Sequence, residues 1–265
     1  MIERLSIRGH DLAVTTLGHG PLPMVMIHCS LGNHRSLARL AKAFSDTHRI
    51  RLIDMPGHGN SGPWDGEADI QGLVSEAAAC VADPGSHVFG HSFGATAALR
   101  MAVDHPDLVT RLALYEPVYF TPIIGTPVYD AYLARFAPFV AEMEAGRHDR
   151  AAEIFNGMWG GTPWDVLPAF VRRDMAARIW FIMASERAFE GDVGRVFAPG
   201  RLDRLACDVT LMLGQRTEPV MPHVMEAIAA RIAGARLIRF DEAGHMGPLT
   251  HPGLVAQAMA RSPTS

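Results

Sequence analysis

Residues 87–94 read His-Val-Phe-Gly-His-Ser-Phe-Gly, and they carry the most informative pattern in the chain. It joins a short apolar run to an Ala-rich helical pattern, ATAALRMAV, at residues 95–103. The turn between them matches G-x-S-x-G, with Ser92 at its centre. Such a strand–turn–helix displays the serine hydroxyl at the C-terminal edge of a sheet, and its glycines remove Cβ atoms that would clash. The alternative is a glycine-rich turn with an incidental serine.

Outward from this turn, short apolar runs alternate with helical patterns. Strands are expected at Glu3–Arg8, Asp11–Thr16, Met24–His28, Ile50–Ile53, His87–Phe89, Leu112–Tyr115, Val209–Leu213 and Arg236–Phe240. Helices are expected near Ser36–Phe44, Ile70–Val81, Phe93–Val103, His223–Ile232 and His251–Ala260. The first two strands form a predicted hairpin. The alternation predicts an α/β fold with a doubly wound, mostly parallel sheet of about eight strands.

The alternation stops from Glu116 to about Leu205, where no convincing buried strand occurs. Helical stretches replace it, rich in aromatic residues and interrupted by Pro and Gly, near Val128–Ala145, Arg150–Met158 and Val166–Phe189. We therefore expect one sheet domain, residues 1–116 and 206–265, with a helical cap inserted at residues 117–205.

Composition excludes several classes of protein. The 265 residues are 48% hydrophobic and 20% charged, with a net charge of −4 and no basic stripe. This disfavours nucleic acid and anionic membranes as partners. The three cysteines form no C-x-x-C pair, which argues against a disulfide framework or a zinc site. The N-terminal stretch has no apolar segment of signal-peptide length, so a cytoplasmic protein is expected.

Three further motifs extend the pattern around Ser92. They are His28-Cys29-Ser30-Leu31-Gly32, the loop from Asp54 to Ser61 that reads DMPGHGNS, and Gly244-His245-Met246. Together with the serine turn, their types and order resemble the α/β-hydrolase superfamily, over residues 28 to 245. The resemblance implies a hydrolase whose nucleophile is Ser92. One departure is Cys29, where the family commonly has Gly.

A general base must accept the serine proton during attack. Among 13 histidines, His245 is favoured because it follows an apolar strand in a glycine-rich loop and comes after Ser92 in the family's order. His91 is interpreted as structural, His58 as part of a loop scaffold, and His28 as a brace for the loop that follows the third strand. The resemblance also implies an oxyanion hole made by the backbone N–H groups of Ser30 and Phe93.

The acid of the triad is the difficult assignment. The resemblance places an Asp after the strand at Val209–Leu213, but Thr217 occupies that position. Glu218 is one residue late and precedes a proline, which biases its backbone toward extended geometry. Glu116 ends an earlier strand, where some relatives carry their acid. We favour Glu116 over Glu218, and we interpret Asp54 as structural.

These residues predict acyl transfer to water, from an ester or lactone of a small, moderately apolar substrate. No metal or organic cofactor is implied, and a monomer or homodimer is expected. Ser at position 92 argues against epoxide and haloalkane hydrolysis, which need a carboxylate nucleophile. The alternatives are C–C bond hydrolysis, acyl transfer to an alcohol, cofactor-free peroxidase chemistry, a small-ligand receptor, and a degenerate hydrolase kept as an interaction protein.

Overall fold

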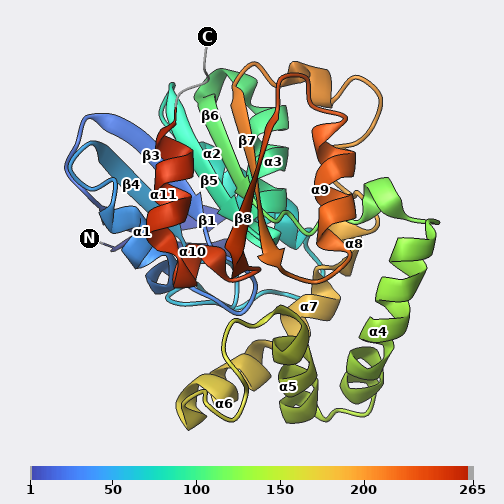
Figure 1. Cartoon of the computed structure of the whole chain (residues 1–265). Coiled ribbons are helices and arrows are strands. Elements are labelled where there is room, and N and C mark those ends of the chain that lie inside the picture. Colours follow the sequence, from blue (N-terminus) through green and yellow to red (C-terminus); the bar gives the residue numbers. More distant parts are fainter. Residues whose placement is uncertain (1, 262–265) are drawn as a thin grey trace.

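The computed structural model describes residues 2–261 and contains one mixed sheet of eight strands between layers of helices (Figure 1). The strands are β1 (Ile2–Ile7), β2 (His10–Leu17), β3 (Leu22–Ile27), β4 (His48–Ile53), β5 (Ser86–His91), β6 (Val109–Tyr115), β7 (Asp208–Arg216) and β8 (Arg236–Gly244). Their spatial order is β1-β2-β4-β3-β5-β6-β7-β8. Only the β1–β2 and β2–β4 pairs are antiparallel. The predicted doubly wound, mostly parallel sheet is confirmed.

The strand order explains why the candidate site residues gather at one edge of the sheet. β3 lies between β4 and β5, so the chain leaves β3 toward one side of the sheet and later returns to its other side. In open α/β sheets, ligands bind at the carboxyl ends of the strands where the order reverses in this way. The loops after β3 and β5, which carry Ser30 and Ser92, therefore meet at such a point.

Two buried clusters, one on each face, hold the helices to the sheet. Side chains of β3 alternate between them: Val25 and Ile27 belong to one cluster, and Met24 and Met26 to the other. The first cluster includes side chains of α2 (Ile70–Val81), α3 (Phe93–Asp104) and α9 (Met221–Ala229), and the second those of α1 (Ala38–Lys42) and α11 (Pro252–Ala260). Both faces of the central strands are thus covered, as parallel strands require.

The segment between β6 and β7 is helical. It contains α4 (Pro127–Glu144), α5 (His148–Trp159), α6 (Ala169–Arg178), α7 (Trp180–Ala184) and α8 (Glu186–Phe189). No strand occurs from 117 to 205, a stretch that the structure describes completely. Figure 1 shows α5, α6 and α7 beyond the end of the sheet toward which the arrows of β7 and β8 point.

The helical stretch expected near Val166–Phe189 consists of three short helices, α6, α7 and α8. Pro168 precedes α6 and sets its start. The chain then tightens, since the N–H of Ile179 bonds to Ala176 O and that of Ile182 to Ile179 O. Such three-residue bonds interrupt an α-helix and change its direction. No helix within residues 2–261 is both long and apolar enough to cross a membrane.

Candidate active site

Ser92 occupies the tight turn between β5 and α3. Its backbone has φ 56° and ψ −120°, a conformation that non-glycine residues rarely adopt. The turn also needs glycine on both sides of it. A Cβ on Gly90 would overlap the backbone of Ala95, and one on Gly94 would overlap the carbonyl of His28. The strained serine is therefore held between β5 and the helix that follows, as the motif predicts.

His245 lies beside Ser92, at the carboxyl end of β8. Its Nε2 is 2.9 Å from Ser92 Oγ, and its Nδ1 is 2.7 Å from Glu116 Oε2. A carboxylate only accepts hydrogen bonds, so Nδ1 carries the proton of the neutral ring and Nε2 is free to accept one. Both Ser92 and His245 are buried, at 5% and 7% exposure, which excludes most of the water that would compete for these bonds.

Glu116 reaches this histidine from the end of β6. Its backbone is in the left-handed region at φ 44°, and its side chain is completely buried. Three donors satisfy the carboxylate: Oε1 accepts from the N–H of Gly214 at 2.8 Å, and Oε2 accepts from Thr217 Oγ1 and His245 Nδ1, each at 2.7 Å. Both oxygens of this buried carboxylate therefore have hydrogen-bond partners, as a buried polar group requires.

The two rival acids lie elsewhere. Glu218 is buried, and its Oε1 accepts from Arg135 Nη2 on α4 at 2.9 Å rather than from His245. Asp54 is also buried, and it accepts from the backbone N–H groups of His34 and Asn60. Its side chain therefore organises the loops after β3 and β4. The structure brings Glu116 to the histidine and leaves both other carboxylates away from it.

The loop after β3 carries Ser30 and is held from two directions. The N–H of Leu31 donates to His58 Nε2 at 3.1 Å, and the carbonyl of Leu31 accepts from Arg178 Nη2 at 2.9 Å. Leu31 itself has φ 61°. These bonds fix the peptide planes next to Ser30 without using its amide. Arg178 belongs to α6, nearly 150 residues from Leu31 along the chain, so no local sequence pattern predicts this contact.

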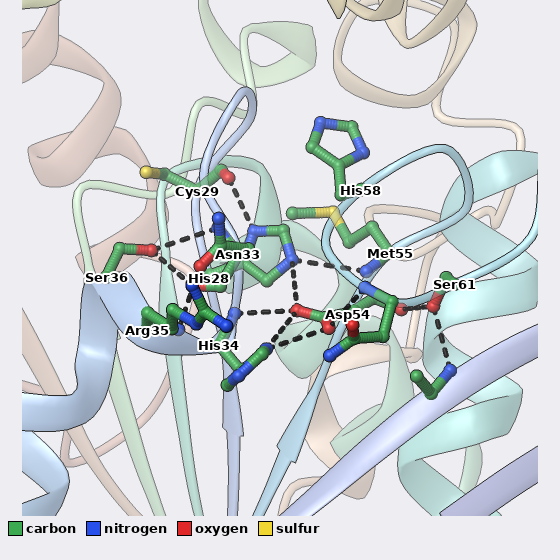
Figure 2. Close-up of polar contacts among 12 residues, drawn as sticks. His28, Cys29, Asn33, His34, Arg35, Ser36, Asp54, Met55, His58 and Ser61 are labelled. Atoms are coloured by element: carbon green, nitrogen blue, oxygen red, sulfur yellow. Dashed lines mark hydrogen bonds and ion pairs between the residues drawn. The ribbon is translucent and has the colours of Figure 1, made fainter. Parts of the chain in front are cut away.

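His28 joins the loops after β3 and β4, as Figure 2 shows. Its Nδ1 donates to the carbonyl of Cys29 at 2.7 Å, and its Nε2 accepts from the N–H of Met55 at 3.1 Å. Burial lowers the pKa of His28 to about 4, and it lowers the pKa of His58 well below the ordinary value. Both rings are therefore neutral at pH 7, and they serve as hydrogen-bonding braces.

Two side chains hold the loop that carries His245 by donating to its backbone carbonyls. His91 Nε2 donates to the carbonyl of His245 at 2.8 Å, and the hydroxyl of Tyr115 donates to the carbonyl of Gly244 at 2.8 Å. His91 thus points to the histidine loop, which fits its structural interpretation. Sequence reasoning missed Tyr115, whose only signal was its position at the end of a buried strand.

Two cavities meet at Ser92. The first is small, about 30 Å³, and is lined by apolar and mostly aromatic side chains beside Ser30, Ser92 and His245. Those side chains are Val118, Phe120, Tyr132, Phe136, Phe155, Trp159, Ile182 and Phe189. The second is an open cleft of about 560 Å³ that includes residues of the loop after β3 and of α6.

The methionines of the inserted helices contribute little to these cavities. Of Met143, Met158, Met175 and Met183, only Met175 lines either one, and all four pack against the buried core. Aromatic rings form the walls instead. The indole of Trp159 lies edge-on to the imidazole of His245, with ring centroids 4.7 Å apart.

Comparison with known proteins places the chain in a family. The sequence profile described as the alpha/beta hydrolase family matches residues 24–258. Lipase LipV of Mycobacterium tuberculosis is 30% identical over 95% of this chain and 97% of its own length. A pimeloyl-[acyl-carrier protein] methyl ester esterase of Neisseria meningitidis serogroup A is 27% identical over 85% of this chain and 72% of its own length.

Solved structures agree on the fold. A hydrolase from Pseudomonas aeruginosa aligns with a TM-score of 0.72 at 20% identity, covering 97% of this chain and 96% of the other. Naproxen esterase from Bacillus subtilis aligns with a TM-score of 0.71 at 18% identity, covering 97% of this chain and 89% of the other. At these identities the likeness concerns the fold alone.

Proposed function

The chain belongs to the α/β-hydrolase family and is an α/β-fold hydrolase, and we propose that it cleaves a carboxylic ester through an acyl-enzyme formed on Ser92. The observation that carries this proposal is the continuous chain of hydrogen bonds from Ser92 through His245 to Glu116. The curated relatives named as lipase and methyl ester esterase support ester cleavage. Geometry and role define such a triad, whatever the order of its members along the chain.

In the proposed reaction, Ser92 Oγ attacks the ester carbonyl while its proton passes to His245 Nε2. Glu116 holds the Nδ1 proton in place and stabilises the imidazolium that forms. The N–H groups of Ser30 and Phe93 would receive the oxyanion. His245 then protonates the leaving alcohol. In the second half-reaction a water molecule gives its proton to His245 and attacks the acyl-enzyme, and His245 returns the proton to Ser92 Oγ as the acid leaves.

We propose that residues 117–205 act as a cap that shapes the substrate site. The cap side chains Phe136, Trp159 and Ile182 line the small cavity, and Phe170 and Met175 line the cleft. The small cavity, at about 30 Å³, is far smaller than the cleft. The cleft falls within the range of pockets that bury small-molecule ligands.

This pair of cavities favours an open-chain ester over a lactone. The two groups of an open-chain ester point away from its carbonyl, so a small group can enter the aromatic cavity while a longer, apolar group lies in the cleft. A small lactone ties both groups into one ring and cannot divide them in this way. The substrate that fits best is an ester with one short and one longer, moderately apolar group.

The test is covalent labelling with a fluorophosphonate, followed by peptide mapping and turnover of esters, thioesters and lactones. We expect the label on Ser92, and we expect Ser92→Ala to lose both label and turnover. Ser30→Ala is the matched control, since it keeps the backbone N–H and should remain active. Multiple turnovers separate an enzyme from a receptor, which would bind its ligand and release little product. Undiminished turnover by a folded Ser92→Ala variant would overturn the proposal.

A further inference from the structure

Thr217 follows β7, at the position where the family resemblance places the acid of the triad. Its side chain contacts Glu116, the carboxylate at the end of β6. Its hydroxyl donates to Glu116 Oε2 at 2.7 Å, the same oxygen that accepts from His245 Nδ1. The other oxygen, Oε1, is held by the N–H of Gly214. The carboxylate is therefore fixed by one donor on Oε1 and two on Oε2.

The hydroxyl constrains the carboxylate in a way that the other two donors cannot. Glu116 reaches the site from β6, whereas both Gly214 and Thr217 belong to β7 and the loop that follows it. The terminal torsion of a glutamate is broad. The N–H of Gly214 holds only Oε1, and His245 is itself the group to be oriented, so Thr217 is the donor that holds Oε2 independently of the histidine. A second donor on Oε2 aims that oxygen at His245.

We propose that Thr217 is a positioning residue of the catalytic site, which orients Glu116 so that its carboxylate can stabilise protonated His245. The proposal rests on the triad proposed above. Thr217 touches neither substrate nor reacting atoms and acts only through Glu116. The distances add a second consequence. An oxygen of residue 217 already lies next to the oxygen that serves His245, so a carboxylate placed at 217 would itself come within reach of the histidine.

The first test replaces the hydroxyl by a methyl group of similar shape. Thr217→Val should lower kcat by about tenfold or more, as expected for a lost hydrogen bond to a charged group, with KM little changed. Without this donor Glu116 is aimed less well at His245 and stabilises the protonated ring less. The acid limb of the pH–rate profile should therefore move to lower pH.

Two controls separate positioning from packing. Thr217→Ser keeps the hydroxyl and should restore kcat and the pH profile to near those of the wild type. Thr217→Ala opens space beside a cleft of about 280 Å³ that Thr217 and His245 both line, so water can replace the hydroxyl, and its loss should be smaller than that of Thr217→Val. If folded Thr217→Val keeps the wild-type kcat and pH profile, the proposal is overturned.

The second test moves the carboxylate from position 116 to position 217. Glu116→Ala should be nearly inactive, and Glu116→Ala combined with Thr217→Asp should recover a measurable part of the lost kcat. Thermal melting of each variant shows whether it is folded. A folded double variant no more active than Glu116→Ala would overturn the claim that residue 217 lies within reach of His245. Failure of the triad itself would appear separately, as turnover that survives Ser92→Ala in the wild-type background.

Discussion

At the scale of single residues, the candidate site depends on a glutamate with an uncommon backbone. Glu116 ends β6 at φ 44°, and this left-handed residue directs its side chain across the end of β7. A non-glycine residue in this region persists only when its surroundings hold it there. Its own N–H bonds to Met212 O, and its carboxylate takes three donors. The strain is thus compensated by bonds that also orient His245.

Glu116→Gln tests this role against a matched carboxylate. The amide keeps the shape but loses the charge that stabilises the imidazolium, so kcat should fall by roughly a thousandfold or more. Glu218→Gln alters a buried glutamate that contacts Arg135 rather than His245, and it should leave kcat within about threefold of the wild type. Steady-state kinetics on a reactive ester measure both. The reverse pattern would move the acid to Glu218.

At the scale of elements, the turn from β5 into α3 determines where Ser92, the proposed nucleophile, lies. α3 packs so closely against the end of β3 that Gly94 leaves no space for a side chain beside the carbonyls of Ile27 and His28. The same closeness brings the loop after β3, with Ser30, next to Ser92. The proposed oxyanion hole therefore forms only when β3, β5 and α3 are packed together.

Gly94→Ala should destabilise this element strongly. The added methyl group meets backbone, which cannot move without shifting β3 from α3, so we expect a loss of about 2–4 kcal/mol in the free energy of unfolding. Gly157→Ala is the matched control, because Gly157 lies inside α5 with open space around the new methyl group. The free energy of unfolding of Gly157→Ala should rise by about 0.5–1 kcal/mol, because alanine has a higher helix propensity than glycine. Urea denaturation compares them, and equal stability of the two variants would contradict this account.

At the scale of the whole molecule, the carboxyl edge of the sheet contains a set of buried neutral histidines. His28, His58 and His91 are at most 1% exposed, and burial lowers the pKa of each. They hold the loops after β3 and β4 and the loop of His245 with neutral donors and acceptors. Protonation of any one of them would place a charge where little water can solvate it.

Stability should therefore fall in mildly acidic solution. Unfolded His28 titrates near 6.5 and folded His28 at about 4, so between these values the unfolded chain binds more protons. The stabilisation is complete above pH 6.5 and is lost as the pH falls toward 4, by about 3 kcal/mol for this residue. His58 and His91 act in the same direction.

Urea denaturation at pH 7 and at pH 4.5 measures this effect. His28→Asn removes one titrating group, so its stability should depend less on pH than that of the wild type. His148→Gln changes an exposed histidine on α5 and should leave the dependence unaltered. A wild-type stability that stays constant across this window would show that these histidines titrate normally.

The amino-acid sequence alone determined the features that depend on neighbours along the chain. The strand–turn–helix around Ser92 was predictable because residues 87–103 carry the apolar run, the glycines and the helix former in immediate succession. The sheet followed from the same kind of local alternation, repeated along the chain. His245 could be favoured because a glycine-rich loop follows an apolar strand at that point.

Which groups meet across the sheet edge depends on the packing of strands and helices in three dimensions. Glu116, Glu218 and Thr217 were all near strand ends in the sequence, and their roles differ because β6 and β7 lie side by side and Glu116 turns at a positive φ. The contacts of Arg178 with Leu31 and of Tyr115 with Gly244 join residues more than a hundred positions apart. No pattern of neighbouring residues encodes such distances, since they result from the packing of whole elements against one another.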